Sequence, residues 1–258
     1  MDAITRASID ECISAVSDLF DSVFAPIDQW SIAVEEYVAA LRGTLTRAGI
    51  DTLMENLVMR ELAREQGSVI GAGFVATPGF IADAEWHLAW WLGGLNTFGV
   101  GSEAPRIRRL DAVEDALNES FRDYTTLEWW RVPIRTGQRH ITGPYVDYLC
   151  TDDYTLTLTK PVRQGKETIG IVGADLYVAD VERELLPRLR AIGSSVTLVN
   201  SSGRVVLSTD MHLPTGSLLR LEGLTDALSN RDDSVLSSRL AGGQEVISCG
   251  KTGLAVII

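Results

Sequence analysis

The sequence has few of the residues on which catalysis and metal binding usually depend. Its 258 residues include three histidines and three cysteines. The cysteines, Cys12, Cys150 and Cys249, are far apart and show neither CxxC nor Cys/His spacing, which predicts packing residues in a reducing compartment rather than a disulfide or a zinc site. No GxSxG or HExxH motif is present, and the GxG at 71–73 lacks the third glycine and the basic residue of a phosphate loop. We therefore expect no metal and no cofactor.

Positive charge and long apolar runs are also scarce. Against 35 acidic residues the chain has 23 Lys and Arg, a formal net charge of -12, which would repel nucleic acid. The longest apolar run, 68–82, contains three glycines and a proline and is too short to span a bilayer. The N-terminus lacks the basic and apolar segments of a secretory signal. These features predict a cytoplasmic chain that binds neither nucleic acid nor membrane, and they leave open whether it is free-standing or a fragment of a longer receptor.

Apolar periodicity predicts a helical N-terminal region. From Ile4 to about Gln66, apolar residues recur three or four positions apart, as an amphipathic helix requires. We expect one long helix, broken at Pro26, and then a shorter helix that ends at Gly67.

The remaining segments predict an α+β protein with antiparallel sheets. We expect strands at 68–77, 105–113 and within 140–177, a helix or tight loop at 83–92, a short helix at 113–121, a helix at 178–193, a hairpin at 194–210 and a strand pair around 248–253. No strand-helix alternation calls for a parallel sheet. The expected domains are a helical region (1–66), a ligand-binding module (67–193) and a smaller antiparallel module (194–258).

Two carboxylates occupy positions where a strand should bury apolar groups. In "HITGPYVDYL", Tyr145 and Asp147 are two residues apart and share one face of a strand, whereas Asp175 lies in the apolar run "TIGIVGADLYV", which is typical of a central strand. A buried carboxylate needs a partner. The candidates are the nearest cations along the chain, backbone N–H groups at a turn, or a ligand; the cations are Arg131, Arg135 and Lys160.

Aromatic residues flank the same segment. Trp129 and Trp130 precede it, and Tyr145, Tyr148 and Tyr154 lie within it or follow it. Aromatic faces beside carboxylates suit an ammonium group, since each face contributes about 0.5 to 2 kcal/mol of cation-π attraction. Simple core filling by the two tryptophans is the alternative.

Four segments in this order resemble the double Cache family of sensor domains: "YTTLEWWRVPI", "TGPYVDYLCTDDYTLTLTKPV", "GIVGADLYVADVERELL" and "VTLVNSSGRVVLSTD". The resemblance implies a PAS-like antiparallel sheet on a long N-terminal helix, a second smaller module, and a non-enzymatic role in signal transduction. It also implies that Trp129, Tyr145, Asp147 and Asp175 contact the ligand. Amino-acid-binding members have an arginine two residues before this tryptophan to pair the ligand carboxylate, and here that position holds Leu127.

The departure at Leu127 resembles the amine-binding branch of the family. The expected ligand is a biogenic amine, a quaternary ammonium compound or a polyamine, or else an amino-acid-like molecule. The predicted ligand-binding residues are Trp129, Trp130, Arg131, Tyr145, Asp147, Tyr148 and Asp175, with no catalytic residue. The resemblance further implies a homodimer through the N-terminal helix, and the absence of a signalling module implies output to a regulatory protein partner.

Three other hypotheses about function stay open. Arg131 could turn inward and make the site a sensor of organic acids. An enzyme of unknown class could use 85–87 or Asp152 and Asp153, although a helix face and a polar loop explain those residues equally well. The pocket could also be degenerate, which would leave an interaction module.

Overall fold

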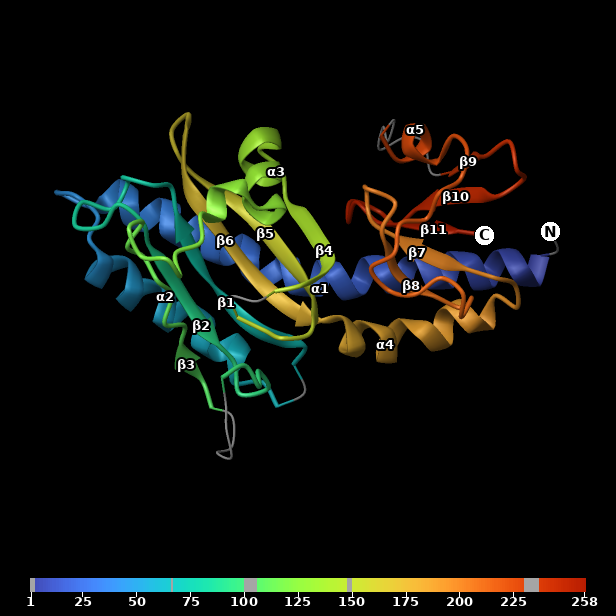
Figure 1. Ribbon diagram of the computed structural model, residues 1–258, viewed down its shortest axis with the longest axis horizontal. Helices are drawn as coiled ribbons and strands as arrows, with labels where there is room; N and C mark the ends of the chain where they lie inside the picture. Colours follow the sequence, from blue (N-terminus) through green and yellow to red (C-terminus); the bar gives the residue numbers. More distant parts are fainter. Residues whose placement is uncertain (1–2, 66, 100–105, 148–149, 230–236) are drawn as a thin grey trace. The chain divides into compact units, whose positions relative to one another are not determined.

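The computed structural model describes residues 3–65, 67–99, 106–147, 150–229 and 237–258 (Figure 1). In chain order its elements are α1 (Ala3–Ala40), α2 (Arg47–Leu62), β1 (Val69–Ala76), β2 (Leu88–Leu92), β3 (Arg108–Arg109), the short 3-10 helix η1 (Tyr124–Thr126), α3 (Glu128–Thr136), β4 (His140–Val146), β5 (Tyr154–Gln164), β6 (Glu167–Tyr177), α4 (Val178–Ala191), β7 (Thr197–Val199), β8 (Val205–Ser208), α5 (Leu224–Ser229), β9 (Ser237–Arg239), β10 (Glu245–Ser248) and β11 (Ala255–Ile257).

The strands form two sheets. The six-stranded sheet has the order β3-β2-β1-β6-β5-β4, and the five-stranded sheet has the order β8-β7-β11-β10-β9. The recorded pairs β1–β2, β1–β6 and β5–β6 of the larger sheet are antiparallel. The predicted α+β class, with a long N-terminal helix and antiparallel sheets, is therefore confirmed.

Contacts divide the chain into two compact units. One consists of Met1–Ser22, Ile141–Tyr145 and Val178–Ile258, and the other of Val23–His140 and Val146–Tyr177. The predicted boundaries of the three domains stay a prediction. No helix among the described residues is both long enough and apolar enough to cross a membrane.

Helices lie on both faces of the six-stranded sheet. On one face, the Lys160 ammonium of β5 lies 2.7 Å from Asp28 Oδ1 of α1. On the other face, the hydroxyl of Thr159 donates to the carbonyl of Trp129 in α3, at 3.0 Å. Adjacent residues of a strand point to opposite faces, so these two bonds place the N-terminal turn of α3 across the sheet from α1. Figure 1 shows α3 over β5 and β6.

The predicted break at Pro26 is wrong, because α1 continues through this residue. A proline inside a helix removes one backbone hydrogen bond and costs about 3 kcal/mol. The neighbouring turns bury Phe20, Phe24 and Ile27 almost completely. Burial of each such side chain contributes about 1.5 to 3 kcal/mol, so packing outweighs the local penalty.

The segment 83–92 was predicted as a helix or loop, but Leu88–Leu92 form β2. All five residues are buried, so the strand has no polar positions to produce the alternating pattern of a half-exposed strand. The predicted short helix at 113–121 is also wrong, since these residues form no helix and Leu117 is 94% exposed. Of the predicted strand at 105–113, the described residues that form a strand are Arg108–Arg109.

The second sheet starts where the sequence predicted. The hairpin β7–β8 begins at Thr197, close to the expected start near Ser195, and β10 pairs with β11 as the terminal strand pair. Its core is built from the buried side chains Val199, Val205, Leu224, Leu228, Leu240, Val246, Ala255 and Ile257.

Candidate functional site

Asp175 lies in the middle of the six-stranded sheet. It is 2% exposed, and its neighbours across the two adjacent strands are Gly71 of β1 and Thr157 of β5. The Thr157 hydroxyl donates to Asp175 Oδ1 at 2.7 Å. This geometry confirms the predicted burial of Asp175 in a central strand.

Asp147 reaches the same place from the turn after β4. The strand ends at Val146, so Asp147 is the first residue beyond it rather than a strand residue as predicted, and it is 8% exposed. The backbone N–H of Thr151 donates to the carbonyl of Asp147 at 2.8 Å, and the side-chain amide of Asn96 donates to the carbonyl of Cys150 at 3.0 Å. The first bond ties Asp147 to Thr151, and the second ties Cys150 to the segment that follows β2.

Cys150 bridges the two carboxylates. Its Sγ lies 2.9 Å from Asp147 Oδ2 and 3.3 Å from Asp175 Oδ2. A thiol has one proton, so it donates to only one of the two oxygens at a time. Ligand atoms of the three residues all lie within 4.8 Å of one another, which is close enough for one cation to contact all three.

The buried position makes negative charge costly at this site. Burial, and then the charge of Asp147, raise the pKa of Asp175 to about 7, although the hydrogen bonds from Thr157 and Cys150 act in the opposite direction. Burial and the two carboxylates also raise the pKa of Cys150 well above its ordinary value, so the thiol keeps its proton. Within the described part of the chain, no ion pair is recorded for Asp175. A cation near these oxygens would therefore relieve an unfavourable charge.

Glycines leave a bare strip of sheet beside Asp175, and the indole of Trp90 lies on it. A Cβ on Gly71 would lie 2.9 Å from Trp90 Nε1, a Cβ on Gly73 would lie 2.9 Å from Cε3, and a Cβ on Gly173 would lie 3.5 Å from Cη2. The ring thus extends across β1 to β6. A larger residue at Gly71 would displace the ring, whereas one at Gly73 would first meet the backbone of β2 at Ala89 and Trp90.

The two predicted tryptophans belong to α3 and pack on Tyr124. Trp129 and Trp130 are buried, and their ring centroids lie 6.2 and 5.1 Å from that of Tyr124. Trp86 also makes an edge contact with Tyr124, at 5.1 Å between ring centroids. Tyr124 itself donates to the carbonyl of Ala76 at 2.7 Å. These contacts give both tryptophans a packing role in the unit that contains Asp175.

The other predicted residues are placed as follows. Arg131 is exposed on α3, and Tyr145 is partly buried in the unit that does not contain Asp175. Tyr148 lies outside the described residues. The structure therefore brings together Asp147 and Asp175 from the predicted set, and it adds Cys150 and Trp90, which the sequence analysis did not assign to the site.

The cations proposed as partners of Asp175 are engaged or exposed elsewhere. Lys160 pairs with Asp28, and Arg135 is exposed near the end of α3. The sequence carried no signal for Cys150, because it lies three residues after Asp147 and would face the other side of a continuous strand.

Comparisons with known proteins agree with this architecture. Residues 62–183 match the family model described as the first PDC sensor domain of methyl-accepting chemotaxis protein-like sequences. The fold is that of a Cache (PDC) sensor domain. No curated protein sequence matches the chain.

Solved structures of sensor domains are similar over nearly the whole chain. Methyl-accepting Chemotaxis protein X has a TM-score of 0.60 at 17% identity, covering 98% of this chain and 94% of its own. The ligand-binding domain of Pseudomonas fluorescens chemoreceptor CtaA in complex with L-valine has a TM-score of 0.55 at 14% identity, covering 96% and 91%. The domain of Pseudomonas aeruginosa PAO1 chemoreceptor PctC in complex with GABA has a TM-score of 0.50 at 15% identity, covering 96% and 95%.

These matches support a Cache sensor domain and give no support to the enzyme alternative, since the matched family consists of sensor domains. The cytoplasmic location, the dimer and the regulatory protein partner stay predictions, as does the preference for an amine.

Proposed function

We propose that this Cache domain is a sensor that binds a small organic cation at Asp147, Cys150 and Asp175. The observation that carries the proposal is the pair of buried carboxylates joined through one thiol. Two such groups repel each other and lose hydration on burial, and a protonated amine would neutralise the charge while donating hydrogen bonds to both.

Two further observations support an amine. The relatives CtaA and PctC were solved with L-valine and GABA, both of which carry an ammonium group. Amino acids also carry a carboxylate, but at the position of the family's arginine this chain has Leu127, which cannot pair with one. Arg131 is exposed. We therefore infer that the cationic end of the ligand is the part that is recognised.

Calorimetric titration of the protein at pH 8 tests the proposal. The panel consists of propylamine, ethanolamine and putrescine, with lactate and acetate as carboxylate-only probes. We expect at least one amine to bind, and an amine present at about 100 times its Kd should stabilise the fold by about 2.7 kcal/mol in a denaturation experiment. Tighter binding of lactate than of every amine would contradict the proposal and favour the organic-acid alternative through Arg131.

Amine binding should weaken in acid. Asp175 has a pKa of about 7 and is protonated below that pH, whereas an alkylamine keeps its proton up to about pH 10. The amine must displace the proton of Asp175 to bind, so the apparent affinity should fall about tenfold for each pH unit below about 6.5 and level off above pH 7.5. Titrations at pH 5.5, 6.5 and 8 measure this. An affinity that is independent of pH would show that Asp175 does not take part in amine binding.

A divalent metal ion is the second cation that this group could hold. The three ligand atoms within 4.8 Å include a thiol, which Zn²⁺ prefers as thiolate. Cys150→Ser separates the two candidates. Amine binding should change by less than about threefold, because a hydroxyl can still donate to Asp147, whereas Zn²⁺ binding should fall by more than about tenfold. If Cys150→Ser loses amine binding but keeps its affinity for zinc, the expected roles of the thiol toward the two cations are wrong.

A further inference from the structure

The indole of Trp90 carries a polar group that its protein surroundings leave unused. Trp90 is 6% exposed, and its Nε1 has no hydrogen-bond partner among the described residues. Buried tryptophan N–H groups normally find an acceptor, because a donor that loses water without a replacement destabilises the fold. An orphan donor in a sensor domain is therefore a candidate ligand contact.

This donor lies beside the carboxylate of Asp175. The position of a Cβ on Gly71 is 2.9 Å from Trp90 Nε1 and 3.2 Å from Asp175 Oδ2, so the two atoms are separated by about 6 Å at most. The strand pairing explains the approach, since Gly71 is paired with Asp175 on one side and with Leu92, two residues after Trp90, on the other. The missing side chain of Gly71 allows this close approach, because a Cβ there would lie too near the indole nitrogen.

We propose that Trp90 Nε1 donates a hydrogen bond to a neutral acceptor on the ligand whose ammonium group binds Asp175. This assignment rests on the proposed function and narrows its ligand class. Two hydrogen bonds of about 2.9 Å must reach atoms about 6 Å apart or less. A nitrogen and an oxygen separated by two carbon atoms meet that requirement. The ligand is then a small amino alcohol or amino amide.

The acceptor is neutral because of the charges around it. Asp147 and Asp175 converge on Cys150, within 3.3 Å of its sulfur. A ligand carboxylate at the indole would lie beside this negative charge in a buried region, where like charges repel strongly. A hydroxyl or an amide carbonyl accepts from the indole without this repulsion.

Isosteric ligands test the acceptor. Ethanolamine and propylamine have the same number of heavy atoms and the same ammonium group, and they differ by a hydroxyl in place of a methyl. Calorimetry at pH 8 should give ethanolamine an affinity about tenfold higher than that of propylamine. Glycinamide should also bind more tightly than glycine, whose acceptor is anionic.

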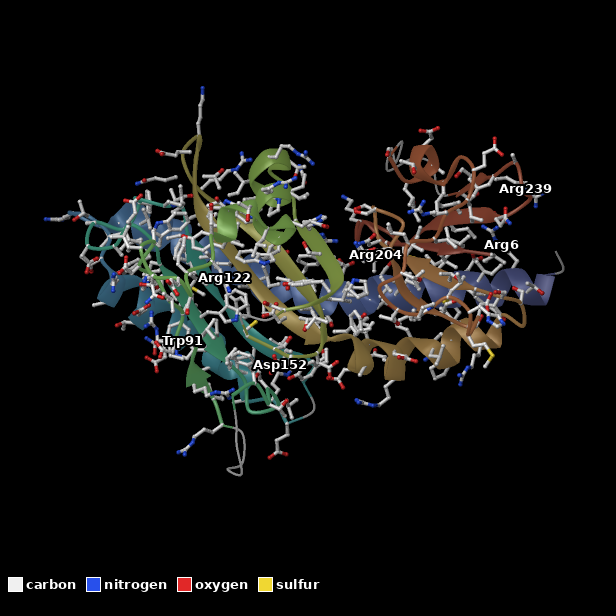
Figure 2. The ribbon with its side chains drawn as sticks, viewed as in Figure 1. Arg6, Trp91, Arg122, Asp152, Arg204 and Arg239 are labelled. Atoms are coloured by element: carbon white, nitrogen blue, oxygen red, sulfur yellow. The ribbon has the colours of Figure 1, made fainter. Side chains whose placement is uncertain are left out.

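Trp90→Phe tests the donor, because phenylalanine keeps an aromatic ring and removes the N–H. We expect the variant to bind ethanolamine about tenfold more weakly and propylamine within about twofold of the wild type. The matched control is Trp91→Phe. Trp91 (labelled in Figure 2) is the next residue of β2 and faces the opposite side of the sheet. There the Arg109 guanidinium lies 6.0 Å from the centroid of its ring. This control should bind both amines as the wild type does.

Three results would overturn the inference. If Trp90→Phe loses affinity equally for ethanolamine and propylamine, Trp90 only packs against the site. If glycine binds more tightly than glycinamide, the acceptor on the ligand is not neutral. In both cases amines still bind and the proposed function stands. No binding of any amine to the wild type would remove both proposals.

Spectroscopy of the wild type covers the case in which Trp90→Phe fails to fold. The indole N–H resonances of a protein labelled with ¹⁵N in tryptophan report on each ring separately. One resonance should shift strongly with ethanolamine and weakly with propylamine, and it should persist in Trp91→Phe. Identical shifts with the two amines would contradict the inference.

Discussion

Asp175→Asn is expected to abolish amine binding and, at the same time, to stabilise the unliganded protein at pH 8. The two effects have one cause. At pH 8 Asp175 is largely ionised although it is 2% exposed, and burial has raised its pKa to about 7. Asparagine has nearly the same shape, still accepts from Thr157, and carries no charge to desolvate. We expect at least about 1 kcal/mol of added stability at pH 8 and more than about a hundredfold loss of affinity.

The pH dependence of stability fixes the sign of this effect. A carboxyl whose pKa is higher in the folded than in the unfolded state holds its proton more tightly when folded. The stability that the Asp175 carboxyl contributes to the fold is therefore fully present below pH 3.8 and is lost as the pH rises through about 7. Urea denaturation of wild type and Asp175→Asn should show a difference in stability that is clearly larger at pH 8 than at pH 5.

The matched control is Asp152→Asn. Asp152 (labelled in Figure 2) is exposed just before β5, and the substitution makes the same chemical change. It should change neither stability nor binding measurably. If Asp175→Asn destabilises the protein at pH 8 as much as at pH 5, the carboxylate is already compensated within the protein, and the reason for a cationic ligand disappears.

Asp175 could be predicted from the sequence because one carboxylate interrupts an apolar run that is otherwise typical of a central strand. Its burial follows from the neighbours along the chain. The residues that face Asp175 across the sheet cannot be predicted from its neighbours along the chain, because those partners depend on strand order and register. Cys150 approaches Asp175 from a turn without periodicity, and the sequence analysis assigned it only to packing.

Trp90 was missed for two related reasons. β2 is buried throughout, so it has no alternating pattern, and the segment was expected to be a helix or a loop. Gly71 and Gly73 were compared with a phosphate loop, whereas their role becomes visible only when β1 pairs with β2 and the indole lies over them. The sequence analysis assigned Trp129 and Trp130 to the ligand site, and the ring contacts that the structure shows for them are with Tyr124.

His87 lies between two carboxylates that come from separate parts of the chain. It is 1% exposed, with Nε2 2.9 Å from Asp51 Oδ1 of α2 and Nδ1 2.9 Å from Glu114 Oε1. The backbone N–H of Leu88 also donates to Glu114, and Arg109 pairs with Asp51 at 3.0 Å. Asp51 is hydrogen-bonded to Nε2, whereas Glu114 lies close to Nδ1 without hydrogen-bond geometry, so it is mainly the charge of the two carboxylates that favours the imidazolium over the neutral ring.

The pKa values of His87 and Glu114 move in opposite directions. Burial alone lowers the pKa of His87, but the hydrogen bonds and charges of Asp51 and Glu114 outweigh it, and the pKa is raised above 6.5. Burial raises the pKa of Glu114, but His87, the Leu88 N–H and Arg47 outweigh it, and the pKa falls below 4.5. The stability from His87 is complete below pH 6.5 and is lost at higher pH, whereas that from Glu114 is complete above pH 4.5. Both contributions are therefore complete between these two values.

His87→Leu should lower the free energy of unfolding by about 3 kcal/mol at pH 5.5, because it leaves two partly buried carboxylates without their shared cation. The loss should be smaller at pH 8.5, where the wild-type histidine approaches neutrality. The matched control is His140→Leu, since Nε2 of His140 lies 3.0 Å from one more exposed carboxylate, Glu128. This surface pair should contribute less than about 1 kcal/mol. Urea denaturation at both pH values measures all four differences, and equal costs for the two variants at pH 5.5 would show that the cluster around His87 does not stabilise the sheet through charge.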